Sequence, residues 1–243
     1  MPPLDEIQQK REIIESRARI REFVFGIQDG LISTVGLLAG VQGATENNLV
    51  VVITGLTSMF AGAVSMATGS YLSSTAQKQI FDKELREAED LAGREPYLAA
   101  EGLLQALSQE GLKKEQSYRL VKLLAEEEKV FLRTFQEKVF GLGTAEINRP
   151  LQAALVMGLS FVLGAVIPLL PYLLLSGMSA LYVSIVLAAA TLFSVGVFKG
   201  YLAARPLFLS GLEFFFIAVG AALFGYLIGL VVQYFFPDVA IQV

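Results

Sequence analysis

The sequence predicts an all-α membrane protein with five transmembrane helices and a cytoplasmic three-helix insert between the second and third of them. Of its 243 residues, 54% are hydrophobic and 17% are charged, and the mean hydropathy is +0.57, a balance typical of membrane proteins. A spanning helix needs roughly 20 mostly apolar residues. The segments that meet or nearly meet this length are 23–43, 49–75, 151–174, 178–204 and 207–236. Charged residues gather instead between positions 77 and 149, which indicates a solvated insert.

The first 22 residues are strongly charged and lack the apolar core and small-residue cleavage site of a signal peptide. Their apolar residues recur at helical spacing as Leu4, Ile7, Ile14 and Ile20. This pattern predicts an amphipathic helix on the membrane surface, with a plain solvated helix as the alternative. The predicted organisation is an N-terminal helix at 1–22, two spans at 23–75, a cytoplasmic domain at 76–149 and three spans at 150–243.

The orientation of the spans follows from the distribution of Lys and Arg. Of the 19 basic residues, five precede the first span, twelve lie between the second and third, and the last two are Lys199 and Arg205 at the junction of the fourth and fifth. The opposite ends of the spans carry none. This sorting predicts that the N-terminus, the insert and the last junction lie in the cytoplasm, and the C-terminus on the other side.

The insert is predicted to contain three helices. The first continues from the second span to about residue 92, the second covers 97–109, and the third covers 113–140. The intervening sequences GREP and EGLKKE contain the turn and breaker residues expected between helices.

Several glutamates of the insert fall on or beside the apolar faces of these helices. Helical periodicity places Glu84 inside the apolar stripe of the first helix and Glu128 inside that of the third, with Glu87 and Glu127 at the stripe edges. A carboxylate that faces a bundle interior is costly unless it is paired, protonated or bound to a cation. Two interpretations stay open: these side chains turn to water or to Lys and Arg, or they bind a divalent cation as a group, as glutamates do in some helical bundles.

Ionisable residues also occur within the spans. Asp29 lies about two turns inside the cytoplasmic end of the first span, which makes it a candidate for a substrate or proton pathway. Glu213 lies nearer the end of its span and can reach the interface or pair with Arg205. Met66 lies among small residues, which suit either tight packing or a narrow pore lining.

The composition excludes several functional classes. The chain has no Cys and no His, so it has no thiolate or imidazole chemistry, and any metal ligand must be a carboxylate, a carbonyl, water or a Met sulfur. No nucleophile and base pair, cofactor motif or basic nucleic-acid surface is visible. We therefore expect no enzyme activity, no cofactor and no nucleic-acid partner.

Three stretches together carry a resemblance to a known family. IQDGLISTVGLLAGV at 27–41, AGAVSMATGSYLSSTAQKQ at 61–79 and GVFKGYLAARPLFLSGLEFFFIAVGAALFGYLIG at 196–229 resemble the vacuolar iron transporter family, and the likeness extends from about 23 to 233. The resemblance implies a homodimer with five spans in each chain. Paired first helices would flank a path by which ferrous iron and similar divalent cations leave the cytoplasm in exchange for protons.

The resemblance also implies roles for particular residues. By position, Asp29 would be the pore carboxylate and Met66 the pore thioether. The cytoplasmic metal-binding glutamates would be Glu84, Glu87 and Glu95, with Glu127 or Glu128. The family's G-E-Y-L-S element is GSYLS in this chain, so Ser70 stands where a carboxylate is expected, and the family's PEEE-like run is replaced by GREPYLAAE. These departures imply a weaker, differently tuned cytoplasmic site.

We therefore expect an exporter of ferrous iron driven by proton antiport. Two alternatives stay open: an exporter of manganese or a broad range of divalent cations (Co²⁺ and Zn²⁺ included), and a non-transporting membrane protein whose insert senses metal or binds a partner. We expect a prokaryotic plasma membrane rather than a vacuole-like organelle. Gly26, Gly30, Gly36 and Gly40 are expected to let the first span approach a partner chain closely.

Overall fold

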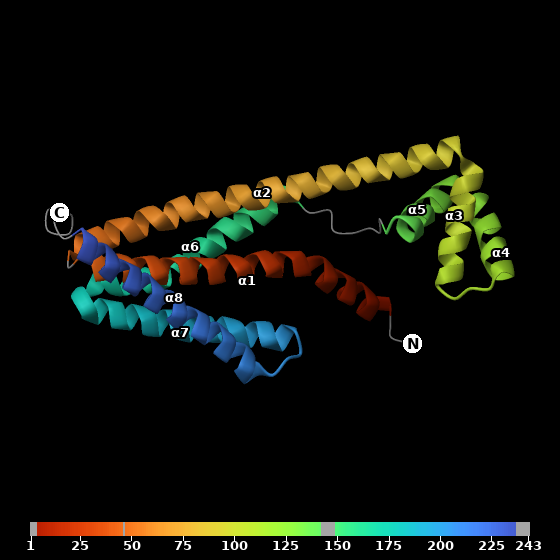
Figure 1. Cartoon of the computed structure of the whole chain (residues 1–243). Coiled ribbons are helices and arrows are strands. Elements are labelled where there is room, and N and C mark those ends of the chain that lie inside the picture. The colour runs from red at the N-terminus through yellow and green to blue at the C-terminus, as the bar shows by residue number, and fades with distance from the viewer. Residues whose placement is uncertain (1–3, 46, 142–148, 237–243) are drawn as a thin grey trace. The chain divides into compact units, whose positions relative to one another are not determined.

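The computed structural model describes residues 4–45, 47–141 and 149–236, with side chains described from Ile20 onward. All regular secondary structure within these ranges is helical, as the sequence predicts. The helices, labelled in Figure 1, are α1 (Leu4–Ala44), α2 (Asn48–Arg94), α3 (Pro96–Gln109), α4 (Lys114–Ala125), α5 (Glu128–Val139), α6 (Pro150–Leu174), α7 (Gly177–Leu202) and α8 (Leu207–Phe235).

The chain divides into two compact units. We name them the membrane unit (Met1–Tyr71 and Pro150–Val243) and the insert unit (Leu72–Arg149). Five helices are long and apolar enough to cross a membrane: α1 from Ile20, α2, α6, α7 and α8, which confirms the predicted number of spans. The helix α2 continues from one unit into the other without a break. The helix α1 is also unbroken, so the described part of the predicted N-terminal segment, from Leu4, joins the first span as one helix.

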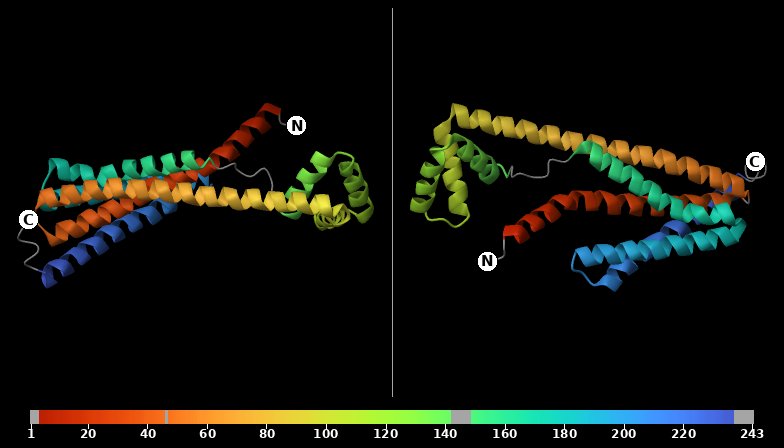
Figure 2. Two further views of the ribbon diagram at one scale, coloured as in Figure 1. Left: turned by 90° about the horizontal axis from the view of Figure 1, so that it is seen from above. Right: turned by 180° about the vertical axis from the view of Figure 1, so that it is seen from behind.

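Within the membrane unit, α1 packs most extensively against α6 and α8, and α7 packs mainly against α8 (Figure 2). The main core combines residues of α1, α6, α7 and α8 with Val51 of α2. Its fully buried side chains include Leu31, Leu38, Tyr172 and Leu192. The first span is therefore the central helix of this unit.

The membrane part of α2 is much less covered than α6. Only 17% of its most apolar 18-residue window is buried, compared with 44% for α6. It contacts α6 through a small cluster in which Met59 and Met66 lie against Phe161 and Ala165. The ring of Phe161 occupies the space left by the missing side chain of Gly62. One side of the membrane part of α2 is thus a long apolar surface that no other described helix of the membrane unit covers.

Glycines bring α1 into backbone contact with two helices of its own chain. A Cβ atom at Gly30 would collide with the carbonyl oxygen of Phe161 on α6, and one at Gly225 of α8 would collide with that of Gly36. Gly26 similarly faces α6, and Gly40 faces Gly229 of α8. We expected these α1 glycines to approach a partner chain. The structure instead uses them for α6 and α8, because small residues allow the backbones of neighbouring helices to come close.

The insert unit combines the end of α2 with α3, α4 and α5 around a second core. Ala99 and Leu103 of α3 are fully buried, and Phe135 of α5 packs beside Phe131 and Phe140. The amide of Gln136 donates to the backbone oxygen of Leu85 on α2, at 3.2 Å. These contacts connect α5 to both α3 and the end of α2.

The predicted long helix over 113–140 is wrong, since the structure divides this segment into α4 and α5. Glu127 lies between them in an extended conformation, with φ −122° and ψ 96°. One straight helix over the predicted range would be about 42 Å long, whereas the 14 residues of α3 span only about 21 Å. The turn therefore lets both halves pack on α3, which both of them contact.

Candidate functional site

Two carboxylates lie on one side of α1 inside the membrane unit. Glu22 and Asp29 are seven residues apart, which is about two helical turns, or roughly 10 Å along the axis. Both belong to the segment from Ile20 to Ala44 that is apolar enough to span a membrane. The central helix thus carries two acidic groups in line along its length.

Glu22 is the only charged residue among the buried residues of the described chain. Its side chain is 11% exposed, whereas that of Arg21 is 67% exposed. The guanidinium Nη2 of Arg21 donates to Oε1 of Glu22 at 3.1 Å, and Oγ of Ser70 donates to Oε2 at 3.4 Å. Glu22 therefore links α1 to α2 at the position where GSYLS lacks a carboxylate.

The sequence analysis did not single out Glu22. It follows Arg17, Arg19 and Arg21, so it resembles one more residue of the charged N-terminal segment. The available signal was its spacing of seven residues from Asp29, which places both carboxylates on the same side of a helix.

Asp29 is half-buried, and the ion pairs of the described chain do not include it. The hydroxyl of Ser33 donates to the backbone oxygen of Asp29 at 2.5 Å, not to its carboxylate. The adjacent Gly30 lies against the backbone of Phe161, which fixes α1 on α6 next to the carboxylate. The position of Asp29 is thus fixed by the close backbone contact between α1 and α6 at the adjacent Gly30.

Met66 is partly buried at the contact between α2 and α6. Ala63 and Met66 pack against the cluster of Met59, Phe161 and Ala165. The observed environment is that of a packing residue at the edge of a small apolar cluster, and a thioether in such a position can also act as a soft ligand.

The five insert glutamates predicted as metal ligands are all exposed: Glu84, Glu87, Glu95, Glu127 and Glu128. Glu84 and Glu128 were expected to face the bundle interior, and this expectation is wrong. No group of three or more acidic residues in the described parts of the chain is arranged to hold a metal ion. Glu87 instead pairs with Lys83, with Nζ and Oε1 3.4 Å apart.

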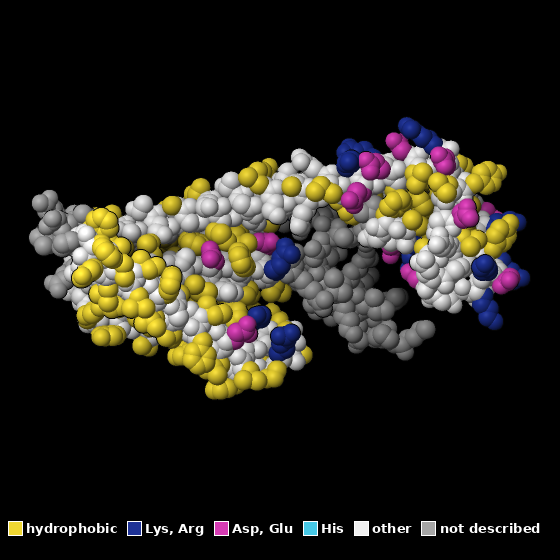
Figure 3. All heavy atoms as spheres, viewed as in Figure 1, with side chains coloured by type: hydrophobic (Ala, Val, Ile, Leu, Met, Phe, Trp, Pro, Cys, Tyr) yellow, Lys and Arg dark blue, Asp and Glu magenta, His cyan; other side chains and the backbone are white. Residues whose placement is uncertain are grey.

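Glu213 is exposed on α8, and no ion pair to Arg205 is present among the described residues. Lys199 of the same junction lies over the ring of Phe214, 4.8 Å from its centroid. On the face shown in Figure 3, the charged side chains of the membrane unit form two groups, one over α1 and one near the α7–α8 junction, and the rest of this face is largely apolar.

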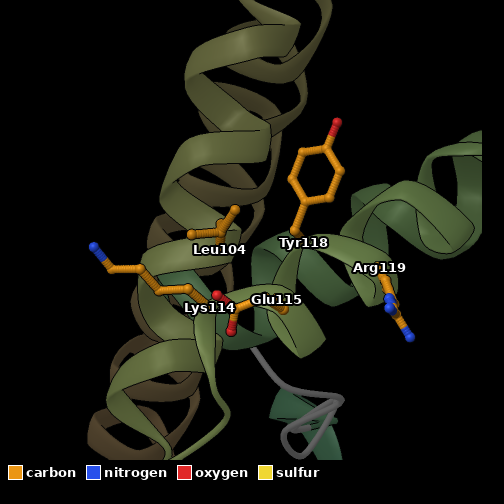
Figure 4. Close-up of a pocket in the computed structure, with 5 residues that line it drawn as sticks. All are labelled: Leu104, Lys114, Glu115, Tyr118 and Arg119. Carbon is orange, nitrogen blue, oxygen red and sulfur yellow. The ribbon is translucent and has the colours of Figure 1, made fainter.

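The insert unit has an open hollow beside α3 and α4 (Figure 4). It is lined by Leu104, Lys114, Glu115, Tyr118 and Arg119. The charged ends of Lys114 and Arg119 point away from each other in Figure 4. With a single carboxylate and diverging cations, this hollow does not form a metal site.

A central membrane helix that carries two carboxylates, within a unit of five spanning helices, defines a multi-pass membrane protein with an acidic strip on its central helix. In such proteins ionisable groups at membrane depth usually mark a pathway for ions or protons. The chain belongs to the VIT family, whose family model matches residues 20–230. This confirms the family that the sequence motifs indicated.

Several relatives are similar over most of their length. Vacuolar iron transporter 1 of Arabidopsis thaliana is 29% identical over 216 residues, which cover 88% of this chain and 86% of the relative. Vacuolar iron transporter 2 of Oryza sativa subsp. japonica is 31% identical, with 80% and 79% covered. Vacuolar iron transporter cccA of Arthroderma benhamiae is 29% identical, with 81% and 72% covered. These relatives are named as transporters, not as enzymes.

Proposed function

We propose that this protein is a metal-ion transporter that exports ferrous iron, or a related divalent cation, from the cytoplasm in exchange for protons. The observation that carries the proposal is the acidic strip formed by Glu22 and Asp29 on α1, in a chain of the VIT family. The names of the relatives supply the metal, iron. The distribution of Lys and Arg supports a cytoplasmic N-terminus and insert.

The two carboxylates suit the proposed cargo. Carboxylate oxygens bind hard and borderline divalent cations, and the thioether of Met66 adds a preference for ferrous iron over magnesium or calcium. A carboxylate must lose its proton to hold a cation. Metal and protons therefore compete for the same oxygens of Asp29, which is the minimum requirement for antiport.

Glu22 supplies the acidic group that GSYLS lacks. In this proposal its carboxylate and the hydroxyl of Ser70 form the cytoplasmic mouth of the path, and Asp29 lies about two turns deeper. The carboxylate of a family relative's G-E-Y-L-S element would come from α2, whereas here it comes from α1.

The proposal includes a homodimer. The half-buried side chain of Asp29 and the largely uncovered membrane part of α2 support this part of the proposal, because both leave surface that a second copy could cover. The glycines of α1 already contact α6 and α8, so a dimer contact would use the side of α1 that carries Asp29. Two facing copies of Asp29 would provide four carboxylate oxygens for one cation.

We retain metal gathering by the insert as a proposal for the assembled dimer. The exposed glutamates of one chain form no metal-holding group of three within the described residues, so ligands from two chains would have to combine. A prokaryotic plasma membrane is our expectation, while the names of the relatives indicate a vacuole.

Manganese or broad divalent export is the second candidate. The mouth formed by Glu22 and Ser70 offers only oxygen atoms, and oxygen ligands suit manganese as well as iron. Competition between iron and manganese in one flux assay separates these two candidates.

The decisive experiment is metal flux in proteoliposomes with an imposed pH gradient, using iron, manganese, cobalt and zinc in turn. We expect Asp29→Asn to reduce flux by roughly 100-fold or more, because even residues that only support a metal ligand contribute about 10- to 100-fold. Flux by Asp29→Asn equal to that of the parent chain would overturn the proposal. Binding of metal without any flux in the parent chain would favour the non-transporting alternative.

A further inference from the structure

Both carboxylate oxygens of Glu22 have partners within the chain. Oε1 accepts from the guanidinium of Arg21 at 3.1 Å, and Oε2 accepts from the hydroxyl of Ser70 at 3.4 Å. A cation that arrives at this carboxylate therefore meets an oxygen that is occupied by a positive charge of the protein itself. The hydroxyl of Ser70 can remain in place, because it is neutral and holds the other oxygen.

The two partners of this ion pair differ in their freedom to move. Glu22 is nearly buried, whereas the side chain of Arg21 is 67% exposed, and Glu22 is the partner with which Arg21 forms an ion pair in the described structure. Rotation of the guanidinium into water therefore breaks one contact and creates no buried unpaired charge on Arg21. Removing Arg21 without a replacement would leave the charge of Glu22 unpaired, which is costly for a buried group.

We propose that Arg21 is a built-in counter-ion that closes the mouth of the path and must be displaced by the incoming cation, so that it selects divalent over monovalent cations. This inference rests on the proposed function, because it names the residue that controls access to the same path. Arg21 acts through Glu22 and is therefore a positioning and selectivity residue, not a metal ligand.

Simple electrostatics explains the selectivity. A divalent cation at about 2.1 Å from a carboxylate oxygen attracts it about three times as strongly as a single charge at the observed 3.1 Å, in the same medium. A monovalent cation gains much less over the guanidinium. It also competes with a group that is tethered beside the carboxylate and so has a high effective concentration. Potassium and sodium therefore leave the ion pair between Arg21 and Glu22 intact.

The test measures Co²⁺ binding by the purified full chain in the Asp29→Asn background, so that the deeper site does not contribute. In this background Arg21→Gln should tighten Co²⁺ binding roughly threefold, because partly exposed ion pairs of this kind contribute modestly. It should also make binding sensitive to 100 mM potassium. Arg21→Lys keeps a charge but loses the planar fork, and we expect an intermediate result. Arg205→Gln is the matched control, since it removes an exposed Arg elsewhere, and it should leave Co²⁺ binding unchanged.

Adding Glu22→Gln identifies the group through which Arg21 acts. The Arg21 substitution should have no effect in that background. An Arg21→Gln protein that elutes and melts like the parent but binds Co²⁺ no more tightly would overturn the inference, as would an effect that survives Glu22→Gln. This binding test is independent of the flux assay. A binding effect of Arg21→Gln in a chain that does not transport metal would support the role of Arg21 and refute the proposed function. Transport by the parent chain without the binding effect would support the proposed function and refute the role of Arg21.

Discussion

The membrane unit and the insert unit use their carboxylates in opposite ways. The insert carries many acidic residues, but its five candidate ligands are exposed and no three of them in the described chain form a metal-holding group. The membrane unit has few, yet Glu22 is almost buried and Asp29 is held beside a backbone contact between α1 and α6. The comparison teaches that the number of acidic residues does not locate a cation site. Under the proposed function, burial and a fixed backbone contact are what distinguish the carboxylates of the path from those of the insert.

The largest expected effect on stability and flux comes from disrupting the backbone contact between α1, which carries the acidic strip, and α8. Gly225→Leu places a side chain where α8 touches the backbone of Gly36 on α1. Overpacking typically costs about 1–3 kcal/mol, and more where the obstacle is backbone that cannot move aside. We expect a clear fall in the thermal unfolding midpoint in detergent and loss of flux. Gly220→Ala on the same helix is the control, because no atom lies within 4 Å of a Cβ there. Equal midpoints for the two variants would contradict the described packing of α1 on α8.

The next effect distinguishes the buried from the exposed membrane carboxylate. Glu22→Gln keeps the shape of the side chain but removes its charge, and we expect proteoliposome flux to fall roughly tenfold or more. Glu213→Gln makes the same change at an exposed position of α8 and should leave flux nearly unchanged. If both variants lost flux equally, burial would not be what sets Glu22 apart.

A third prediction concerns the stability of the insert. Phe135 is 1% exposed and packs beside Phe131 and Phe140, so Phe135→Ala should cost the insert unit about 3–5 kcal/mol. Limited proteolysis of the full chain should then cut within 72–149 while the membrane helices stay protected. Tyr118→Ala, at an exposed position of α4, should leave the cleavage pattern unchanged. Cleavage spreading through the membrane unit would show that the two units do not unfold separately.

The smallest effect is expected from the insert glutamates themselves. Glu84→Gln combined with Glu128→Gln should change the Co²⁺ dissociation constant of the monomeric chain by less than about twofold, since exposed charges interact weakly. The same pair measured in the dimer tests the shared-site proposal. A loss of tenfold or more in the monomer would mean that exposure is a poor guide, and would weaken the comparison between the two units.

Sequence reasoning succeeded where one local signal was sufficient. The apolar lengths of the spans predicted all five, and the structure places Asp29 within the first of them, as its sequence position indicated. It failed where the deciding contact is distant in sequence. Burial of Glu22 was hidden behind a run of arginines, and its link to Ser70 spans 48 positions.

The division of α4 from α5 was missed for a related reason. The apolar stripe continues with helical spacing through the run Glu126 to Glu128, so the local pattern did not mark a turn. The length of α3, on which both helices pack, is a tertiary constraint. The glycines of α1 were correctly interpreted as points of close approach, but composition alone could not name the neighbour.

The glycine contacts of α1 also restrict how this protein can move. Side chains can slide past one another by changing rotamer, but backbone in direct contact with backbone has no such freedom. The contacts from Gly26 and Gly30 to α6, and from Gly36 and Gly40 to α8, therefore join the three helices into one block. The helix α7 also packs on this block, whereas α2, which holds Ser70, makes far fewer close contacts with it, so α2 is the spanning helix that can shift with the least disruption of packing.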